Sequence, residues 1–171
     1  RLLDEAVREL KGEPLKKDIS DITIDINVNA YIDDSYISAE AKKIEMYKKI
    51  AAIRDSNDVM DIEDELTDRY GDIPEPVRNL IDIAYIKALA ASLGFTAVTE
   101  KNGTVTFSLA SAKNINFQAL GKAAEKYKRQ LLFNAGAAPY LVYRIPDGKG
   151  KDLLKNIKIV LQDLKSFEEQ Q

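Results

Sequence analysis

The sequence contains no cysteine and no histidine among its 171 residues. Without cysteine the chain can form neither a disulfide nor a thiolate metal site. Without histidine it lacks the commonest general base and the commonest metal ligand of proteins. The chain therefore lacks the residues that most hydrolytic enzymes use. We expect it to hold no catalytic residue, no metal site and no cofactor site of its own.

Long hydrophobic runs and an excess of positive charge are also missing. No stretch approaches the roughly 20 apolar residues that cross a bilayer, and the N-terminus lacks the pattern of a signal peptide. We therefore expect a cytoplasmic setting and no membrane partner. The formal net charge is -3 at pH 7, so no overall basic field attracts phosphate backbones. We expect little or no direct DNA binding.

The chain does contain enough apolar side chain for one compact, monomeric domain. Hydrophobic residues make up 45% of it, and a chain of this size buries roughly 70% of the surface that it exposes when unfolded. Residues 1–12 carry Leu3, Ala6, Val7 and Leu10 at helical spacing, and the first residue is Arg1. We interpret residues 1–12 as the end of a helix from an upstream part of a longer protein, followed by one domain over residues 13–171.

The first half of that domain reads as one strand and three helices. Apolar and polar residues alternate from Ile22 to Val28, which predicts a strand with one buried face. Helical spacing predicts helices over about 38–51, 56–70 and 75–93. In the first of these we expect Ser38 to be the N-cap and Ile44, Tyr47, Ile50 and Ala51 to share the inner face.

The second half reads as two hairpins and two helices. Strand formers flank Asn102-Gly103, the strongest two-residue hairpin signal, and a second strand pair is expected over 131–133 and 140–143. Helices are predicted over about 115–127, with Ala123 and Ala124 inward, and over about 151–166. The predicted fold class is therefore α+β: a helical half to about residue 94, then a ββαββα half with antiparallel strands from about residue 95.

Three acidic or glycine-rich segments invite a functional reading. Asp33 and Asp34 lack the spaced ligands of a calcium loop, so we interpret them as turn residues. The segment 147–151 lacks the spacing of a phosphate-binding loop and reads as a surface turn. The third segment is an acidic run on the second helix, and charge runs are usually solvated helix faces. Its members are Asp61, Glu63, Asp64, Glu65 and Asp68.

The run from Glu65 to Leu80 ends one helix, turns at Gly71, and starts another at Pro74 and Pro76. It closely resembles the corner ELxDRFGxxPxPVxxLL in the C-terminal domain of the bacterial transcription-repair coupling factors. Other segments resemble that family too: residues 3–12 its leading helix, residues 30–37 its AYIPxxYI segment with Asp33 for proline, residues 47–51 its YKRIA, and residues 90–95 its AxxLGI. The resemblance rests on residues 2–95, because the family is more loosely patterned beyond them.

The resemblance implies a specific role. Members of the family are ATP-driven DNA translocases that displace stalled RNA polymerase and recruit UvrA for nucleotide excision repair. Their Walker and helicase motifs are absent from this sequence, so ATP and magnesium would bind in motor domains elsewhere in the parent protein. In the family the C-terminal domain folds back onto an N-terminal UvrB-like module, masks the UvrA-binding surface and restrains the motor until polymerase is engaged.

The resemblance also implies where that contact lies. The family uses acidic residues of the helix before the corner, and the matching positions are Glu65 and Asp68, with Asp61 one turn earlier. Spaced three and four apart, they would present carboxylates from one helix face to arginines of the partner module. We therefore expect an electrostatic contact between these carboxylates and the partner module, here called the latch.

Two other classes of function remain open at this point. The first is an accessory nucleic-acid-binding domain of a DNA repair helicase, supported by Lys122, Lys126, Lys128 and Arg129 on and after the fourth helix. The second is a small carboxylate-based enzyme, which would need two carboxylates in a shared pocket. Sequence spacing does not show whether such a pocket exists.

Overall fold

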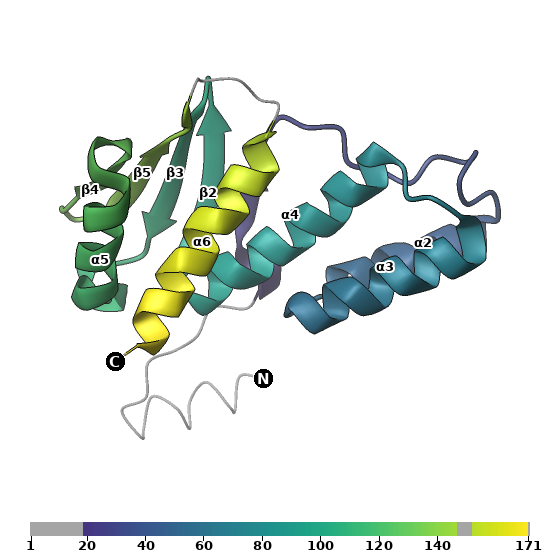
Figure 1. Cartoon of the computed structure of the whole chain (residues 1–171), viewed down its shortest axis with the longest axis horizontal. Helices are drawn as coiled ribbons and strands as arrows, with labels where there is room; N and C mark the ends of the chain where they lie inside the picture. Colours follow the sequence, from purple (N-terminus) through teal and green to yellow (C-terminus); the bar gives the residue numbers. More distant parts are fainter. Residues whose placement is uncertain (1–18, 147–151, 171) are drawn as a thin grey trace.

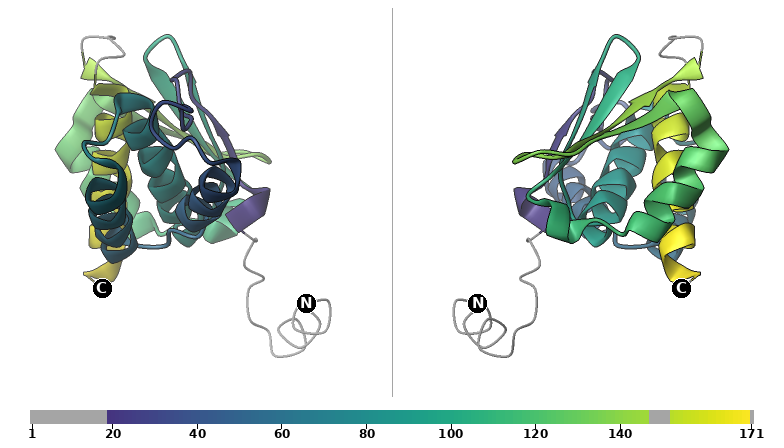
Figure 2. Two further views of the ribbon diagram at one scale, coloured as in Figure 1. Left: turned by 90° about the vertical axis from the view of Figure 1, so that its right-hand side faces the viewer. Right: turned by 90° about the vertical axis from the view of Figure 1, so that its left-hand side faces the viewer.

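A five-stranded sheet with helices packed on one face organises the computed structural model, which describes residues 19–146 and 152–170 (Figures 1 and 2). The strands are β1 (Thr23–Asp25), β2 (Phe95–Lys101), β3 (Thr104–Leu109), β4 (Leu131–Asn134) and β5 (Tyr140–Arg144). The α-helices of the described residues are α2 (Glu40–Ala51), α3 (Ser56–Tyr70), α4 (Glu75–Ser92), α5 (Phe117–Tyr127) and α6 (Leu153–Glu169). The α+β prediction is confirmed.

The sheet has the strand order β1-β2-β3-β5-β4, in which β1 runs parallel to β2 and the other neighbours are antiparallel. Asn102 and Gly103 join β2 to β3 with φ of 52° and 81°, the left-handed conformations that a two-residue hairpin requires. Both predicted hairpins are therefore confirmed. The predicted alternation from Ile22 to Val28 is present in burial, although the strand itself covers three residues.

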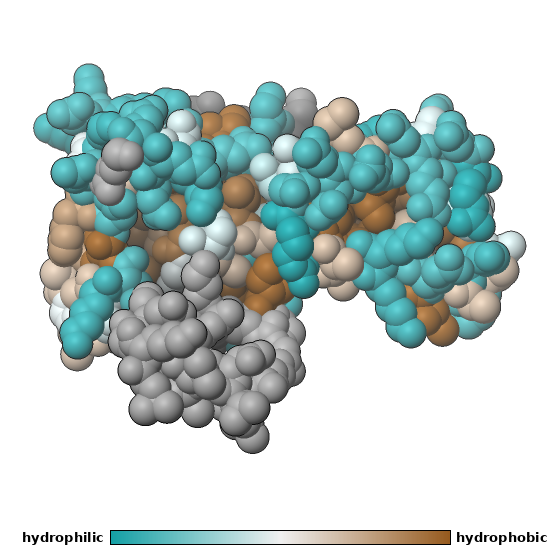
Figure 3. All heavy atoms as spheres, turned by 90° about the horizontal axis from the view of Figure 1, so that it is seen from below, coloured by the Kyte–Doolittle hydropathy of each residue, from teal (hydrophilic) through white to brown (hydrophobic). Residues whose placement is uncertain are grey.

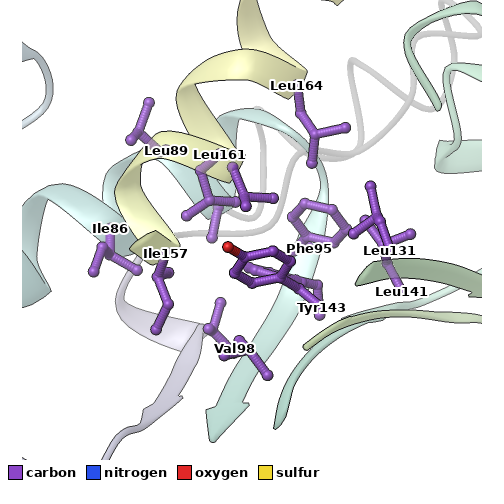
Figure 4. Packing of buried hydrophobic residues seen from close by; sticks show 14 of the residues in the cluster. Ile86, Leu89, Phe95, Val98, Leu131, Leu141, Tyr143, Ile157, Leu161 and Leu164 are labelled. Carbon is purple, nitrogen blue, oxygen red and sulfur yellow. The ribbon is translucent and has the colours of Figure 1, made fainter. Parts of the chain in front are cut away.

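Two apolar clusters fill the part of the molecule that the structure describes, and α4 contributes to both. The first, here called the sheet cluster, packs α4, α5 and α6 on the sheet and includes Phe95, Ile157 and Leu161 (Figure 4). The second, the helical cluster, packs α2, α3 and the start of α4 around Met46 and Leu66. Figure 1 shows α4 running from the sheet to the α2–α3 pair. This shared position explains why α4 is buried on more than one side.

Some predicted helix faces are wrong in detail. Helix α2 is capped by Ala39 instead of Ser38, without a side-chain hydrogen bond. Ile44 is 48% exposed and Ala51 is also exposed, because Met46 and Ile50, four residues apart, form the packed edge of α2. In α5, Ala124 is exposed and the contact runs through Ala119 and Ala123, again four apart.

Two predicted features lie outside the described residues: the helix over residues 1–12 and the turn over residues 147–151. The turn at Asp33 is confirmed, since its carbonyl oxygen accepts hydrogen bonds from the N–H groups of Tyr36 and Ile37. Among the described helices, none combines the length and the apolar character needed to span a membrane.

Candidate functional site

Helix α3, which carries the predicted contact residues, is fixed at both ends. At its start the Asp55 side chain accepts a 2.9 Å hydrogen bond from the Asp58 N–H, and the Asp58 carboxylate accepts one from the Arg54 N–H at 2.8 Å. At its end Gly71 has φ of 86°, and its carbonyl oxygen accepts a 2.9 Å hydrogen bond from the Tyr36 hydroxyl. The predicted helix-turn-helix corner is confirmed, and hydrogen bonds hold α3 in place at both ends.

The inner face of α3 is the predicted apolar stripe. Ile62 and Leu66 are buried in the helical cluster, with Val59 and Tyr70 packed partly buried beside them. Because this stripe points inward, the opposite side of α3 faces solvent. In Figure 3 the surface formed by α2 and α3, on the right, is largely hydrophilic with isolated hydrophobic patches.

Glu65 lies on the side of α3 next to α2, and its carboxylate is already paired within the chain. Its two carboxylate oxygens accept hydrogen bonds from Lys49 Nζ of α2 at 3.0 and 2.9 Å, and Arg69 donates a third at 3.0 Å. The hydrogen bond from Lys49, followed by that from Arg69, holds the pKa of Glu65 below its usual range, although partial burial opposes the shift. The same bond raises the pKa of Lys49. Glu65 therefore ties α3 to α2.

Asp61 and Asp68 differ from Glu65. Both are exposed, and neither has a hydrogen-bond or ion-pair partner in the described part of the chain. With Glu65 between them they occupy helix positions i, i+4 and i+7, so the structure brings the three predicted residues onto one side of α3. Two of the three carboxylates are available to a partner, and the third is held by neighbouring cations.

Of three neighbouring residues, Glu63 and Asp64 belong to the predicted acidic run, whereas Met60 was not singled out from the sequence. Met60 is 59% exposed on α3, and Asp64 is exposed without a partner in the described residues. On the other margin of the helix Glu63 pairs with Arg78 of α4 at 3.3 Å. The exposure of Met60 could have been predicted from the sequence, because Met60 does not fall on the stripe of Val59, Ile62 and Leu66. The Lys49–Glu65 pair joins residues 16 apart and has no such local signal.

The basic residues of the nucleic-acid alternative are partly engaged. Lys122 Nζ donates to Gln170 Oε1 at 2.8 Å, and Lys126 Nζ lies 2.6 Å from Asp163 Oδ2 of α6. Asp163 also accepts a hydrogen bond from the Tyr127 hydroxyl. Burial, followed by this hydrogen bond and the charge of Asp163, raises the pKa of Tyr127. These contacts attach α5 to α6, and they neutralise part of the charge that would meet a phosphate backbone.

The enzyme alternative needs two carboxylates in one pocket. An apolar hollow beside the start of α5 includes one carboxylate, Glu168, and a polar hollow beside the start of α4 includes one, Glu75. In the residues that the structure describes, no group of three or more Asp and Glu residues is placed to hold a metal ion. Neither hollow supplies the pair of carboxylates that general acid and base chemistry requires.

Comparison with known proteins gives a consistent result. Residues 26–120 match the family model of the TRCF domain. The transcription-repair-coupling factor of Staphylococcus aureus (strain USA300) is 35% identical over 135 residues, which cover 77% of this chain and 12% of that protein. The Staphylococcus epidermidis protein of the same name is 32% identical over 134 residues, with the same coverage. The chain therefore spans about an eighth of the length of these relatives.

A solved structure supports the fold. The crystal structure of the C-terminal domain of a transcription-repair coupling factor superposes with a TM-score of 0.77 and covers 88% of this chain and 96% of that one. Sequence identity in this superposition is 24%, so the likeness concerns the fold.

Proposed function

We propose a regulatory role for this chain, which belongs to the TRCF domain family, the C-terminal domain of transcription-repair coupling factors. In its parent protein the domain folds back onto an N-terminal UvrB-like module. There it masks the surface that recruits UvrA and restrains an ATP-dependent DNA translocase until stalled RNA polymerase is engaged. The domain itself catalyses nothing, and ATP and magnesium bind in the motor domains of the parent, which works in the bacterial cytoplasm.

The contact is made by the carboxylates of Asp61, Glu65 and Asp68 on α3. The observation that carries this proposal is that α3 is capped at both ends and paired to α2, while Asp61 and Asp68 stay exposed without partners in the described residues. Charges on a rigid helix lose little conformational entropy when a partner binds them. Arginines are the matching groups, because their planar donors fit carboxylates in a bidentate manner.

The test uses the full-length parent protein with the double substitution Glu65→Ala and Asp68→Ala. Removing one side of a desolvated charge pair leaves the opposing arginine unmatched, which costs about 2 kcal/mol or more. The contact should therefore weaken at least tenfold, and UvrA capture in the absence of polymerase should rise accordingly. Unchanged UvrA capture by a correctly folded variant would contradict the proposal that the carboxylates of α3 make this contact.

A matched control separates the latch from a general charge effect. Asp25 of β1 and Glu169 of α6 are exposed carboxylates on other elements. The double substitution Asp25→Ala and Glu169→Ala removes the same formal charge and should leave UvrA capture at the wild-type level. A urea titration of each variant reports whether the domain is folded, because Glu65→Ala also removes the Lys49 pair.

A further inference from the structure

The two edge strands of the sheet, β1 and β4, differ in charge. β1 covers three residues and includes the exposed Asp25, and a charged side chain protects an edge from pairing with a further strand. β4 (Leu131–Asn134) contains no charged residue and no proline. It lies at the outer margin of the sheet (Figure 1). Among the described residues no strand pairs with its outer side, so its main-chain N–H and C=O groups are open to a further strand there.

Apolar side chains lie beside this edge on the face of the sheet that the helices leave open (Figure 2). Leu132 of β4 is the register partner of Val142 of β5. Both point away from the helices, because the alternate residues Leu131 and Leu141 are buried in the sheet cluster. Leu132 is 57% exposed and Val142 is half-buried. A strand added to β4 would therefore cover Leu132 with one of its own side chains.

Three basic side chains surround the start of β4. Lys128 and Arg129 belong to the 3₁₀ turn η3 (Lys128–Gln130), which leads into β4 and contacts β5. Arg144 follows Tyr143, the register partner of Leu131, so it lies at the same end of the strand pair. All three bases are exposed, and none has a hydrogen-bond or ion-pair partner in the part of the chain that the structure describes. This end of the edge is therefore locally positive, although the chain as a whole has a net charge of -3.

The chemistry of the β4 edge selects one kind of partner. An extended segment adds to a sheet edge through main-chain hydrogen bonds, and unpaired bases at one end of that edge match carboxylates of the segment. A second copy of this chain fits worse, because antiparallel pairing of two β4 strands would set the bases against residues 135–138, which carry no charge. A nucleic acid also fits worse, because the exposed side chains of β4 are Leu132 and Asn134, and neither is an aromatic that stacks on a base.

We propose that β4 binds an extended acidic protein segment, which adds to the sheet as an antiparallel strand. Its main chain pairs with the outer side of β4, and one of its apolar side chains covers Leu132. Because the segment runs antiparallel to β4, its C-terminal end lies beside the start of β4, where its carboxylates pair with Lys128, Arg129 and Arg144. This surface lies on other elements than the contact proposed for α3, and it does not depend on that contact.

The test is an NMR titration of this chain with the capped peptide Thr-Val-Thr-Val-Thr-Glu-Glu. The largest changes in amide chemical shift should fall on β4 and its flanking bases, while the amides of β1, the other edge, should not change. The same peptide ending in Lys-Lys should bind at least about tenfold more weakly, because its charges repel the bases. The acidic peptide with methylated main-chain nitrogens should also bind at least about tenfold more weakly, because it keeps its side chains but loses its main-chain donors.

Variants of the chain locate the contacts. Arg129→Glu with Arg144→Glu should weaken binding of the acidic peptide at least about tenfold. Lys48→Glu with Lys155→Glu is the matched control, because these lysines are exposed on α2 and α6 and the formal charge changes equally. This control should bind like the wild type. Leu132→Asn changes no charge and should weaken binding about fivefold, the effect of losing a small apolar contact. The amide spectrum of each variant reports whether it is folded.

Three results would overturn the proposal. The first is no saturable binding of the acidic peptide, or equal binding of the lysine or the methylated peptide. The second is tighter binding of a short oligothymidylate than of the acidic peptide at the same amides, which would assign the bases to a phosphate backbone. The third is a dimer in sedimentation equilibrium that Leu132→Asn dissociates, which would assign the edge to a second copy of the chain. In each case the latch on α3 would stand.

Discussion

The two apolar clusters of this domain differ in size and in how their margins are held. The sheet cluster contains 19 buried residues and the helical cluster 10, so most of the hydrophobic stabilisation belongs to the sheet. The margins of the helical cluster are closed by polar contacts: Lys49 with Glu65, Arg78 with Glu63, and the Tyr36 hydroxyl on Gly71. The larger cluster provides the scaffold, and the smaller one orients the helix face that we assign to the partner.

The largest effect should come from the centre of the sheet cluster. Phe107 of β3 is completely buried and packs against Phe95 with 5.3 Å between ring centroids. Phe107→Ala should lower the free energy of unfolding by about 3–5 kcal/mol, measured by urea titration. The control is Leu132→Ala on β4, where the side chain is 57% exposed and the change should stay within about 0.5 kcal/mol. Equal losses in both variants would contradict the location of this core.

A smaller and more local effect should follow from Leu66→Ala in the helical cluster. Leu66 is fully buried, so we expect a loss of about 3 kcal/mol. Because the helical cluster is the smaller one, amide hydrogen exchange should accelerate more in α2 and α3 than in β3. Uniform acceleration over the whole domain would show that the two clusters unfold as one unit, which would contradict the expected difference in local stability between them.

Two glycines test the corner that ends α3. Gly71 has φ of 86° and open space around its Cα, so Gly71→Ala adds backbone strain without a clash. We expect a loss of about 1 kcal/mol in the free energy of unfolding. Gly121 lies inside α5, also with open space, and Gly121→Ala should instead stabilise the domain by about 0.5–1 kcal/mol. Changes of the same sign at both positions would contradict this interpretation of the corner.

The smallest effect concerns acid stability at the margin of the helical cluster. The folded-state pKa of Glu65 lies below its unfolded value, so its contribution is present above the unfolded pKa and is lost as pH falls through the folded one. The wild type should therefore lose more stability than Glu65→Gln between about pH 7 and about pH 3. Urea titrations at both pH values measure the difference, and equal losses would show that the Lys49 pair does not stabilise the fold.

Much of the fold is predictable from the sequence because local signals agree with it. The Asn102-Gly103 hairpin, the glycine-proline corner and the apolar stripe of α6 each depend on residues close in the chain. The position of β1 beside β2 depends on a pairing across more than 70 residues, which no local pattern specifies. The same holds for α4, where Ile86, Leu89 and Ala90 are buried against the sheet although the first half of the helix faces α2 and α3.

The candidate site was predictable in part for the same reason. Asp61, Glu65 and Asp68 share a helix face through spacing alone, and the structure places them there. Their unequal availability was not predictable, because Lys49, which holds Glu65, comes from another helix. The exposure of Met60 was predictable, because it lies off the apolar stripe of α3.

The central claim is that the carboxylates of α3 bind the N-terminal module of the parent protein. The most direct measurement is a calorimetric titration of that module with this domain, comparing wild type with Asp61→Asn and Asp68→Asn at low and at high salt. We predict saturable binding by the wild type that weakens with salt, and at least tenfold weaker binding by the variant. Identical binding curves for a folded variant, or no binding by the wild type at low salt, would contradict it.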